Sequence, residues 1–115
     1  MIRRQGTYET EVREAMRGGQ GTVRLEHFWK KPELLGKTRL CAKLILGPGC
    51  SIGPHCHDQE EEVYIVLRGQ GWISEAGTTV EVGPGDSILT GNGATHAVEN
   101  RGSEPLELLA FIVQY

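Results

Sequence analysis

Short apolar segments separated by turn-forming residues dominate the chain after residue 37. The residues that end these segments include Gly83-Pro84-Gly85 and the pair Asn92-Gly93, which is the strongest local turn signal. We expect strands over residues 38–46, 51–57, 62–69, 71–77, 78–83, 86–91, 95–100 and 106–114. So many short strands with almost no helix predict an all-β domain, either a sandwich or a barrel.

The first 37 residues are more polar and less regular. Residues 22–29 alternate roughly between apolar and polar and predict another strand, whereas residues 7–16 could form about two helical turns. The glycine-rich stretch 17–21 is expected to be a flexible linker, since it does not match a phosphate-binding loop. We therefore divide the chain into an N-terminal extension, residues 1–37, and a β domain, residues 38–115.

Two of the expected strands are apolar on both faces. Val63, Ile65 and Leu67 alternate with residues that we expect to point inward, and residues 108–113 form a continuous apolar run. A strand of this kind is usually covered on both sides, and one small barrel cannot cover its own outside. We therefore predict a homodimer in which the extension and a second copy pack on this outer face. The alternative is that residues 1–30 cover it alone.

Composition narrows the class of protein and the kind of partner. The 115 residues are enough for one domain, and a net charge of −3 gives no reason to expect nucleic acid or an anionic membrane as partner. No apolar run approaches the ~20 residues needed to span a bilayer. The cysteines, Cys41, Cys50 and Cys56, are odd in number and lack metal-knuckle spacing. They predict a reducing cytoplasm and no disulfide framework.

Three histidines and one glutamate form a candidate metal site. His55 and His57 are two residues apart and would share one face of a strand, Glu62 opens the next strand, and His96 follows the Asn92-Gly93 turn. If the strands lie side by side, three imidazole nitrogens and one carboxylate oxygen converge. This set suits Mn, Fe, Co, Ni or Zn, with manganese as first choice, and leaves positions open for a ligand.

The same residues lie in a pattern that resembles the cupin superfamily. The first cupin motif matches Gly49, His55-Cys56-His57, Glu62 and Gly69, and the second matches Gly85, Gly91-Asn92-Gly93, His96 and Asn100. The spacing of both motifs is kept over about residues 38–114, although Gly91 replaces the usual proline. The resemblance implies a single-domain cupin β-barrel (a double-stranded β-helix, or jelly roll) after an N-terminal extension, which would pack on the barrel or on a dimer partner.

The resemblance also assigns His55, His57, Glu62 and His96 as the four metal ligands. It favours Glu62 over its two neighbours Glu60 and Glu61, which we expect to be solvated loop charges. Cys56 alternates with the two histidines, so it should point outward and serve packing or an interface.

Other candidate groups come from strand alternation. If the alternation of inward and outward side chains is counted back from His55 and His57 without a bulge, the inward residues of 38–46 are Arg39, Cys41, Lys43 and Ile45. Lys43, and secondarily Arg39, is therefore a candidate for orienting an anionic ligand, unless a bulge turns Lys43 to solvent. Tyr64, on the same face as Glu62, is the other candidate catalytic residue. His27 has no second ligand nearby, so we expect it to be structural or at the surface.

The resemblance extends to small cupins described as oxalate-decarboxylase-like. It implies an enzyme that binds a small carboxylate or diketone on a divalent metal, with dioxygenase or decarboxylase chemistry. Two-domain oxalate decarboxylases carry an arginine where this chain has Ile45, and no lid is evident unless residues 58–61 serve. These departures favour an oxalate-like small acid as ligand over oxalate decarboxylation itself. The alternatives are a non-catalytic ligand-binding sensor, a metal-dependent sugar isomerase or epimerase, and a dimer whose metal is only structural.

Overall fold

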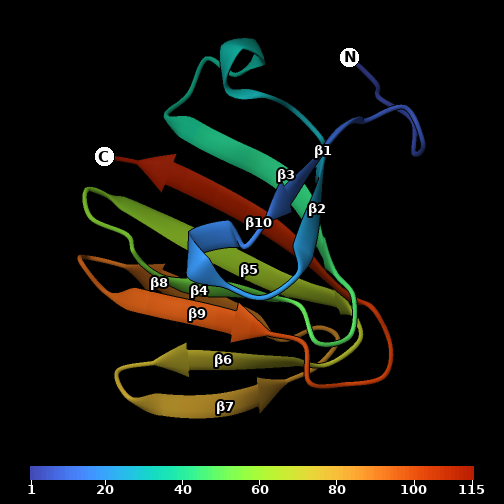
Figure 1. Ribbon diagram of the computed structural model, residues 1–115. Helices are drawn as coiled ribbons and strands as arrows, with labels where there is room; N and C mark the ends of the chain where they lie inside the picture. Colours follow the sequence, from blue (N-terminus) through green and yellow to red (C-terminus); the bar gives the residue numbers. More distant parts are fainter.

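A computed structural model that describes residues 1–115 shows an all-β chain (Figure 1). Its strands are β1 Glu9–Glu14, β2 Thr22–His27, β3 Thr38–Leu46, β4 Ser51–Cys56, β5 Glu60–Arg68, β6 Gly71–Glu75, β7 Thr78–Val82, β8 Ser87–Gly91, β9 Thr95–Glu99 and β10 Leu106–Gln114. Two single 3-10 turns, η1 Met16–Gly18 and η2 Lys31–Glu33, complete the elements. Neither has the length or apolar character needed to cross a membrane. The predicted fold class is confirmed.

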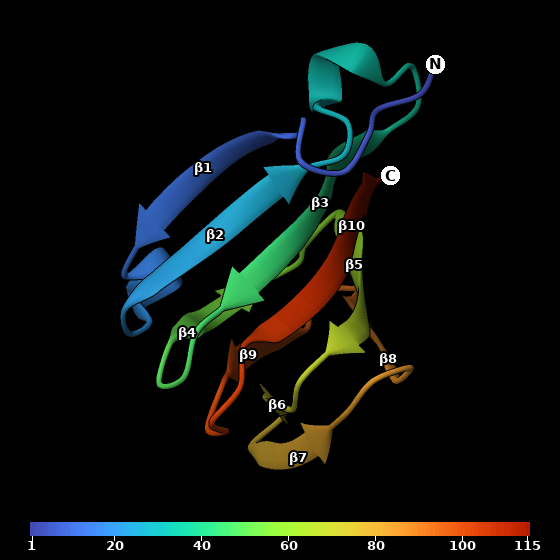
Figure 2. The same ribbon diagram turned by 90° about the vertical axis from the view of Figure 1, so that its right-hand side faces the viewer.

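Two antiparallel sheets build the jelly-roll barrel. The large sheet has the order β1-β2-β3-β10-β5-β8, and the small sheet has the order β4-β9-β6-β7. Figure 2 shows β1 and β2 at one end of the large sheet and β8 at the other. Most neighbouring strands are distant in sequence, since β10 pairs with both β3 and β5, and β9 pairs with both β4 and β6.

The core lies between the two sheets and is filled by side chains from one face of β2, β3, β4, β5, β6, β9 and β10. It comprises Val23, Leu25, Ala42, Leu44, Leu46, Ile52, Tyr64, Val66, Ile73, Val98, Leu106, Leu108 and Ala110. The alternation is regular in β10, where Leu106, Leu108 and Ala110 are fully buried between partly exposed neighbours. A period of two residues is what a sheet with one buried face requires.

The segment before residue 38 contributes strands to the large sheet. β1 pairs with β2 along its whole length, and β2 pairs with β3, where Val23 and Leu25 enter the core. The prediction of helical turns over residues 7–16 is therefore wrong. β1 is an edge strand with exposed side chains on both faces, so it has no apolar alternation, and its backbone hydrogen bonds to β2 determine its conformation.

Part of the outer face of the large sheet is apolar. Leu67 of β5, Leu89 of β8 and Val113 of β10 are exposed there, with 45%, 62% and 38% of their surfaces accessible. Nearer to β3, the aromatic residues Tyr8 and Phe28 pack edge to face, with ring centroids 5.0 Å apart. The N-terminal segment thus covers one part of this face and leaves the part over β5 and β8 open.

Candidate metal centre

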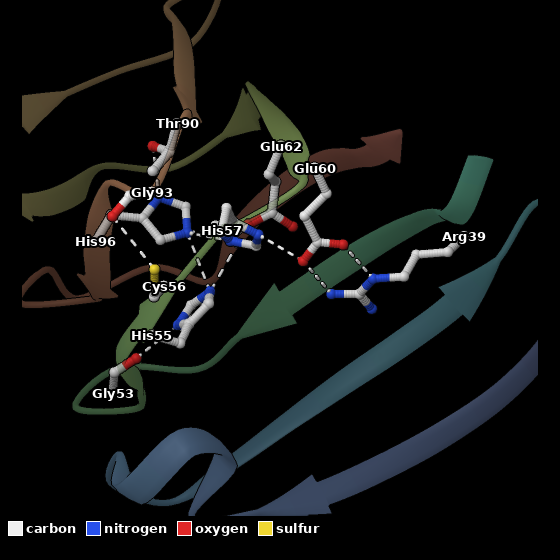
Figure 3. Close-up of polar contacts among 10 residues, drawn as sticks. All are labelled: Arg39, Gly53, His55, Cys56, His57, Glu60, Glu62, Thr90, Gly93 and His96. Atoms are coloured by element: carbon white, nitrogen blue, oxygen red, sulfur yellow. Dashed lines mark hydrogen bonds and ion pairs between the residues drawn. The ribbon is translucent and has the colours of Figure 1, made fainter. Parts of the chain in front are cut away.

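Three strands bring the predicted ligands together at the barrel interior (Figure 3). His55 lies on β4, His57 directly follows it, Glu62 lies on β5, and His96 lies on β9. His55 and His96 are direct partners in the antiparallel pairing of β4 with β9. The turn at Gly93 is bonded to the backbone of His57, because Gly93 N donates to His57 O at 2.9 Å. This bond holds the start of β9 beside the first two histidines.

A bulge in β4 turns the histidines inward. Ile52 pairs with Val98 and His55 pairs with His96, so β4 has one more residue than β9 between these pairs. Ile52 can therefore enter the core while His55, three residues later, also faces the interior. A bulge at the rim of a barrel commonly re-aims a side chain in this way.

The nitrogen atoms Nε2 of the three histidines surround one carboxylate oxygen. Oε1 of Glu62 lies 3.0 Å from Nε2 of His57, 3.0 Å from Nε2 of His96 and 3.8 Å from Nε2 of His55. The nitrogens are also close to one another, at 3.1 Å between His57 and His96 and 3.0 Å between His96 and His55. All candidate ligand atoms lie within 4.8 Å of each other.

The opposite nitrogen, Nδ1, of each ring has its own partner. Nδ1 of His55 lies 2.8 Å from the carbonyl oxygen of Gly53, and Nδ1 of His96 lies 2.8 Å from Oγ1 of Thr90. Nδ1 of His57 lies 3.1 Å from Oε1 of Glu60. A proton on Nδ1 satisfies each contact and leaves the Nε2 lone pair free, which is the arrangement of metal-binding histidines.

A cation fits this group better than hydrogen bonding does. Glu62 is only 3% exposed, and its buried atom Oε1 has no hydrogen-bond partner. With the protons on Nδ1, three nitrogen lone pairs and this oxygen face one another with no proton between them. Buried acceptors without donors are costly and rare. The group could hold a divalent metal through three imidazole nitrogens and one carboxylate oxygen. We call these four residues, His55, His57, Glu62 and His96, the metal group.

The local charges keep the glutamate ionised. Burial alone would raise the pKa of Glu62, but the imidazoles of His55, His57 and His96, whose Nε2 atoms face its carboxylate, hold that pKa well below its usual range. The Glu62 carboxylate in turn raises the pKa of His57, against the opposing effect of burial. A carboxylate that remains ionised among imidazoles is ready to bind a metal ion near neutral pH.

Tyr64 packs directly against this group. Its ring stacks on that of His96, with centroids 5.1 Å apart and planes 11° apart, and the residue is 1% exposed. Burial, and then the charge of Glu62, raise the pKa of the Tyr64 hydroxyl, which therefore stays protonated. Tyr64 thus lines the interior, as predicted, and fixes the orientation of the His96 ring.

Glu60 is not the solvated loop charge that the sequence predicts. It is 8% exposed and accepts hydrogen bonds from Arg39 Nε at 2.5 Å and from Arg39 Nη2 at 2.8 Å, besides contacting His57. Figure 3 shows the resulting row from Arg39 through Glu60 to His57. Arg39 reaches this position because Thr38 and Leu40 pair with consecutive residues of β10, which leaves Arg39 as the extra residue of a bulge.

The prediction that Lys43 faces the interior is wrong. The inward residues of β3 are Ala42, Leu44 and Leu46. Lys43 lies on the other face, where its Nζ is 3.1 Å from Glu26 and 3.7 Å from Glu107. The bulge in β4 adds one residue to the count, so alternation carried back from the histidines selects the wrong face of β3.

Cys56 points away from the metal group, as predicted. It is exposed, and its thiol contacts the carbonyl oxygen of Gly93 at 3.2 Å.

His27 is buried inside the barrel mouth, where Nε2 lies 2.7 Å from Oε1 of Glu11. The prediction of a structural histidine holds, but its partner comes from β1, which the sequence did not identify as a strand.

A cavity of about 330 Å³ leads from the surface to the metal group. Its inner wall includes Leu44, Tyr64 and Ile112 besides the ligands, and its outer wall comes largely from the N-terminal segment. The charged residues that line it, apart from the metal group, are Glu11, Arg13, Arg17, Lys30, Lys31 and Arg39. The mouth is therefore predominantly cationic.

Thr90 and Glu60 are site residues that the sequence reasoning did not select. Thr90 is a polar residue in the apolar strand 86–91, and a hydroxyl at an inward position is a signal that could have been read. Glu60 carried no such signal, because Glu60, Glu61 and Glu62 are chemically identical and the bulge that brings Arg39 to Glu60 cannot be read from the sequence.

Comparisons with known proteins agree with this geometry. The family model of the cupin domain matches residues 42–112. The chain is 38% identical over 113 residues to a Thermotoga maritima protein named oxalate-binding protein, covering 98% of this chain and 93% of the relative.

Solved structures give the same picture. A predicted oxalate decarboxylase from Thermotoga maritima superimposes with a TM-score of 0.95 and 37% identity over the whole of both chains. The polyketide cyclase RemF from Streptomyces resistomycificus has a TM-score of 0.78 over 99% of this chain and 80% of its own. Its identity is 20%, so this second likeness concerns the fold alone.

Proposed function

We propose that this chain, which belongs to the cupin family, binds a small organic acid through a divalent metal ion held by His55, His57, Glu62 and His96. The observation that carries the proposal is the convergence of three Nε2 atoms on a buried Glu62 oxygen that has no hydrogen-bond partner. Manganese is our first choice, and iron, nickel, zinc and cobalt suit the same ligands.

The protein's own residues prepare the site before any ligand enters. The carbonyl oxygen of Gly53, the carboxylate of Glu60 and the hydroxyl of Thr90 fix the three imidazole rings through Nδ1. Tyr64 holds the His96 ring from one side. The bound metal would supply Lewis acidity and open positions at which a carboxylate or a diketone could bind. The apolar inner wall limits the water around that ligand.

Two observations support an acid as the ligand. The mouth of the cavity carries an excess of cationic side chains, which attract anions. A relative that is 38% identical over nearly the whole chain is named for binding oxalate. We propose the same chemical class, a small carboxylate, for this chain.

Turnover of that acid, by decarboxylation or by reaction with dioxygen, is the enzymatic form of the proposal. Binding without turnover is the second candidate, and one observation favours it. The acid and base groups nearest to the metal ligands already have partners, since Glu60 is bonded to Arg39 and Tyr64 is buried beside Glu62. A group that transfers protons needs access to the ligand.

The test is to incubate the manganese-loaded protein with small carboxylates and diketones while following dioxygen and carbon dioxide. Consumption of dioxygen or release of carbon dioxide, both lost in His96→Ala, would establish the enzyme. Saturable binding of the acid without either change would establish the ligand-binding module. Failure of every acid to bind the metal-loaded protein would contradict the proposal in both forms.

We further propose that a second copy covers the open part of the outer face, around Leu67, Leu89 and Val113. An isologous contact would place these exposed apolar residues of β5, β8 and β10 against the same residues of the partner. Light scattering after size-exclusion chromatography should give the mass of a dimer for the wild type and of a monomer for Leu89→Glu. A monomeric wild type would refute this.

A reducing cytoplasm is the proposed location. Cys41, Cys50 and Cys56 are all free thiols, which fits a compartment that keeps cysteines reduced.

A further inference from the structure

One cation at the mouth of the cavity has no partner within the protein. Arg13 is bonded to Glu11 at 3.1 Å, Arg39 to Glu60, and Lys30 to Glu9 at 3.1 Å. Lys31 contacts a side-chain amide oxygen at 3.2 Å. Arg17 lines the same cavity and forms neither an ion pair nor a side-chain hydrogen bond.

The backbone that carries Arg17 is held in an uncommon conformation. Ala15 and Arg17 both have positive φ, at 47° and 54°, which residues with a Cβ adopt rarely. The turn is closed by hydrogen bonds from Gly18 N to Ala15 O and from Gly19 N to Met16 O, each of 2.9 Å. Such conformations persist where the surroundings fix them, and they occur often at ligand sites.

The surroundings that fix this turn belong to the strand of a metal ligand. A Cβ atom on Gly53 of β4 would lie only 2.1 Å from the carbonyl oxygen of Arg17, so the two backbones are in direct contact. The carbonyl oxygen of the same Gly53 holds Nδ1 of His55 at 2.8 Å. One contact thus sets the position of Arg17 relative to the candidate metal ligands.

Arg17 lines the same cavity as the candidate metal ligands. Tyr64, His55, His57 and Glu62 form the inner part of this cavity, and Arg17 belongs to the N-terminal part of its wall. An unpaired arginine offers a planar set of donors that matches a carboxylate in geometry and charge.

We propose that Arg17 binds the acidic group of the ligand that lies farthest from the metal ion. The ligand would then be a diacid longer than oxalate, with one acidic end at the metal and the other at Arg17. The cavity has room for it, since about 330 Å³ is within the range of pockets that enclose ligands much larger than oxalate. This inference rests on the proposed function, because the metal must hold the first end.

The test compares two acids that share the metal-binding end. 2-Oxoglutarate has a distal carboxylate, and 2-oxopentanoate has a methyl group in its place. Calorimetric titration of each acid, and of oxalate, into anaerobic manganese-loaded protein gives dissociation constants without turnover. The variants are Arg17→Met, which removes the charge at similar length, and Arg17→Lys, which keeps it. Arg24→Met is the matched control, because Arg24 is exposed, pairs with Glu26 and lies outside the cavity.

We expect the wild type and Arg24→Met to bind 2-oxoglutarate about tenfold more tightly than 2-oxopentanoate, as one charged hydrogen bond allows. Arg17→Met should remove this preference and leave the affinity for 2-oxopentanoate unchanged, while Arg17→Lys keeps part of the preference. A wild type without the preference, or an Arg17→Met variant that keeps it, would overturn the inference and leave the proposed function standing. Binding of oxalate alone would do the same. A metal-loaded wild type that binds none of the three acids would overturn both.

Discussion

The hydroxyl of Thr90 should control the affinity of the site for metal. Thr90 and His96 are each 1% exposed, and Oγ1 lies 2.8 Å from Nδ1, so water cannot replace the hydroxyl. Thr90→Val replaces this acceptor with a methyl group of nearly the same shape. The proton on Nδ1 of His96 is then buried without a partner whenever Nε2 is bound to metal.

The magnitude follows from two independent estimates. An unsatisfied buried donor costs about 1–3 kcal/mol. Loss of the outer partner of a metal-bound histidine weakens metal affinity about 10- to 100-fold, which corresponds to about 1.4–2.7 kcal/mol. The metal-free protein can avoid most of this cost, because the proton can move to Nε2 of His96 and face Oε1 of Glu62 at 3.0 Å. The metal-free fold should therefore lose less than about 1 kcal/mol.

The assay is competitive titration of zinc or manganese against a chromophoric chelator, with urea unfolding of the metal-free protein in parallel. Thr90→Ser keeps the hydroxyl and serves as the control, with an expected affinity within about threefold of the wild type. The reasoning is refuted if Thr90→Val binds metal within about twofold of the wild type, or if Thr90→Ser is as weak as Thr90→Val.

Three further predictions concern the surroundings of the site. Glu60→Ala removes the acceptor for His57 and the partner of a partly exposed arginine, so the free energy of unfolding in urea should fall by about 1–2 kcal/mol. An unchanged free energy of unfolding would disprove the structural role of this ion pair. Gly53→Ala places a Cβ atom 2.1 Å from the carbonyl oxygen of Arg17 and should lower the stability of the fold by about 1–3 kcal/mol or more. Gly36→Ala, whose Cβ atom would have nothing within 4 Å, should be nearly neutral. Equal effects of the two substitutions in thermal unfolding would contradict the contact between Gly53 and Arg17. Hydrogen bonds from Arg3 and from the Lys30 backbone lower the pKa of Glu33 from 4.5 to about 2, so its stabilising effect is present above about pH 4.5 and lost as the pH falls towards 2. Glu33→Gln should therefore unfold at lower urea than the wild type at pH 6, and this gap should be largely lost at pH 2. Glu81→Gln, which removes no ion pair, should match the wild type at both. A gap for Glu33→Gln that is as large at pH 2 as at pH 6 would count against this assignment.

The sequence was sufficient for nine of the ten strands, β2 to β10, and for the four residues of the candidate metal site. The bounds predicted for β3 and β10 coincide with those of the structure, and the other predicted strands agree within about two residues. Most of these strands have one buried face and are ended by turn-forming residues, so their pattern is strong. His55, His57, Glu62 and His96 converge because motif spacing constrains all four together.

The predictions that failed concern structural features that leave no periodic pattern of apolar residues in the sequence. The edge strand β1 is exposed on both faces, so its conformation depends on backbone bonds to β2. The bulge between Ile52 and His55 and the bulge at Arg39 each add one residue and reverse the alternation. Because of them, alternation read from the sequence places Lys43 on the wrong face and misses the contact between Arg39 and Glu60. A bulge is determined by the pairing of distant strands, and local sequence does not specify that pairing.

Metal content of the untagged protein tests the central claim most directly. Elemental analysis after loading with manganese, iron, nickel or zinc and removal of free metal should find about one ion per chain. His96→Ala should lose the ion, whereas His27→Ala, which removes a buried histidine outside the metal group, should keep it. A wild-type protein that retains less than about a tenth of an equivalent of every metal, or a His96→Ala variant that retains as much as the wild type, would contradict the account.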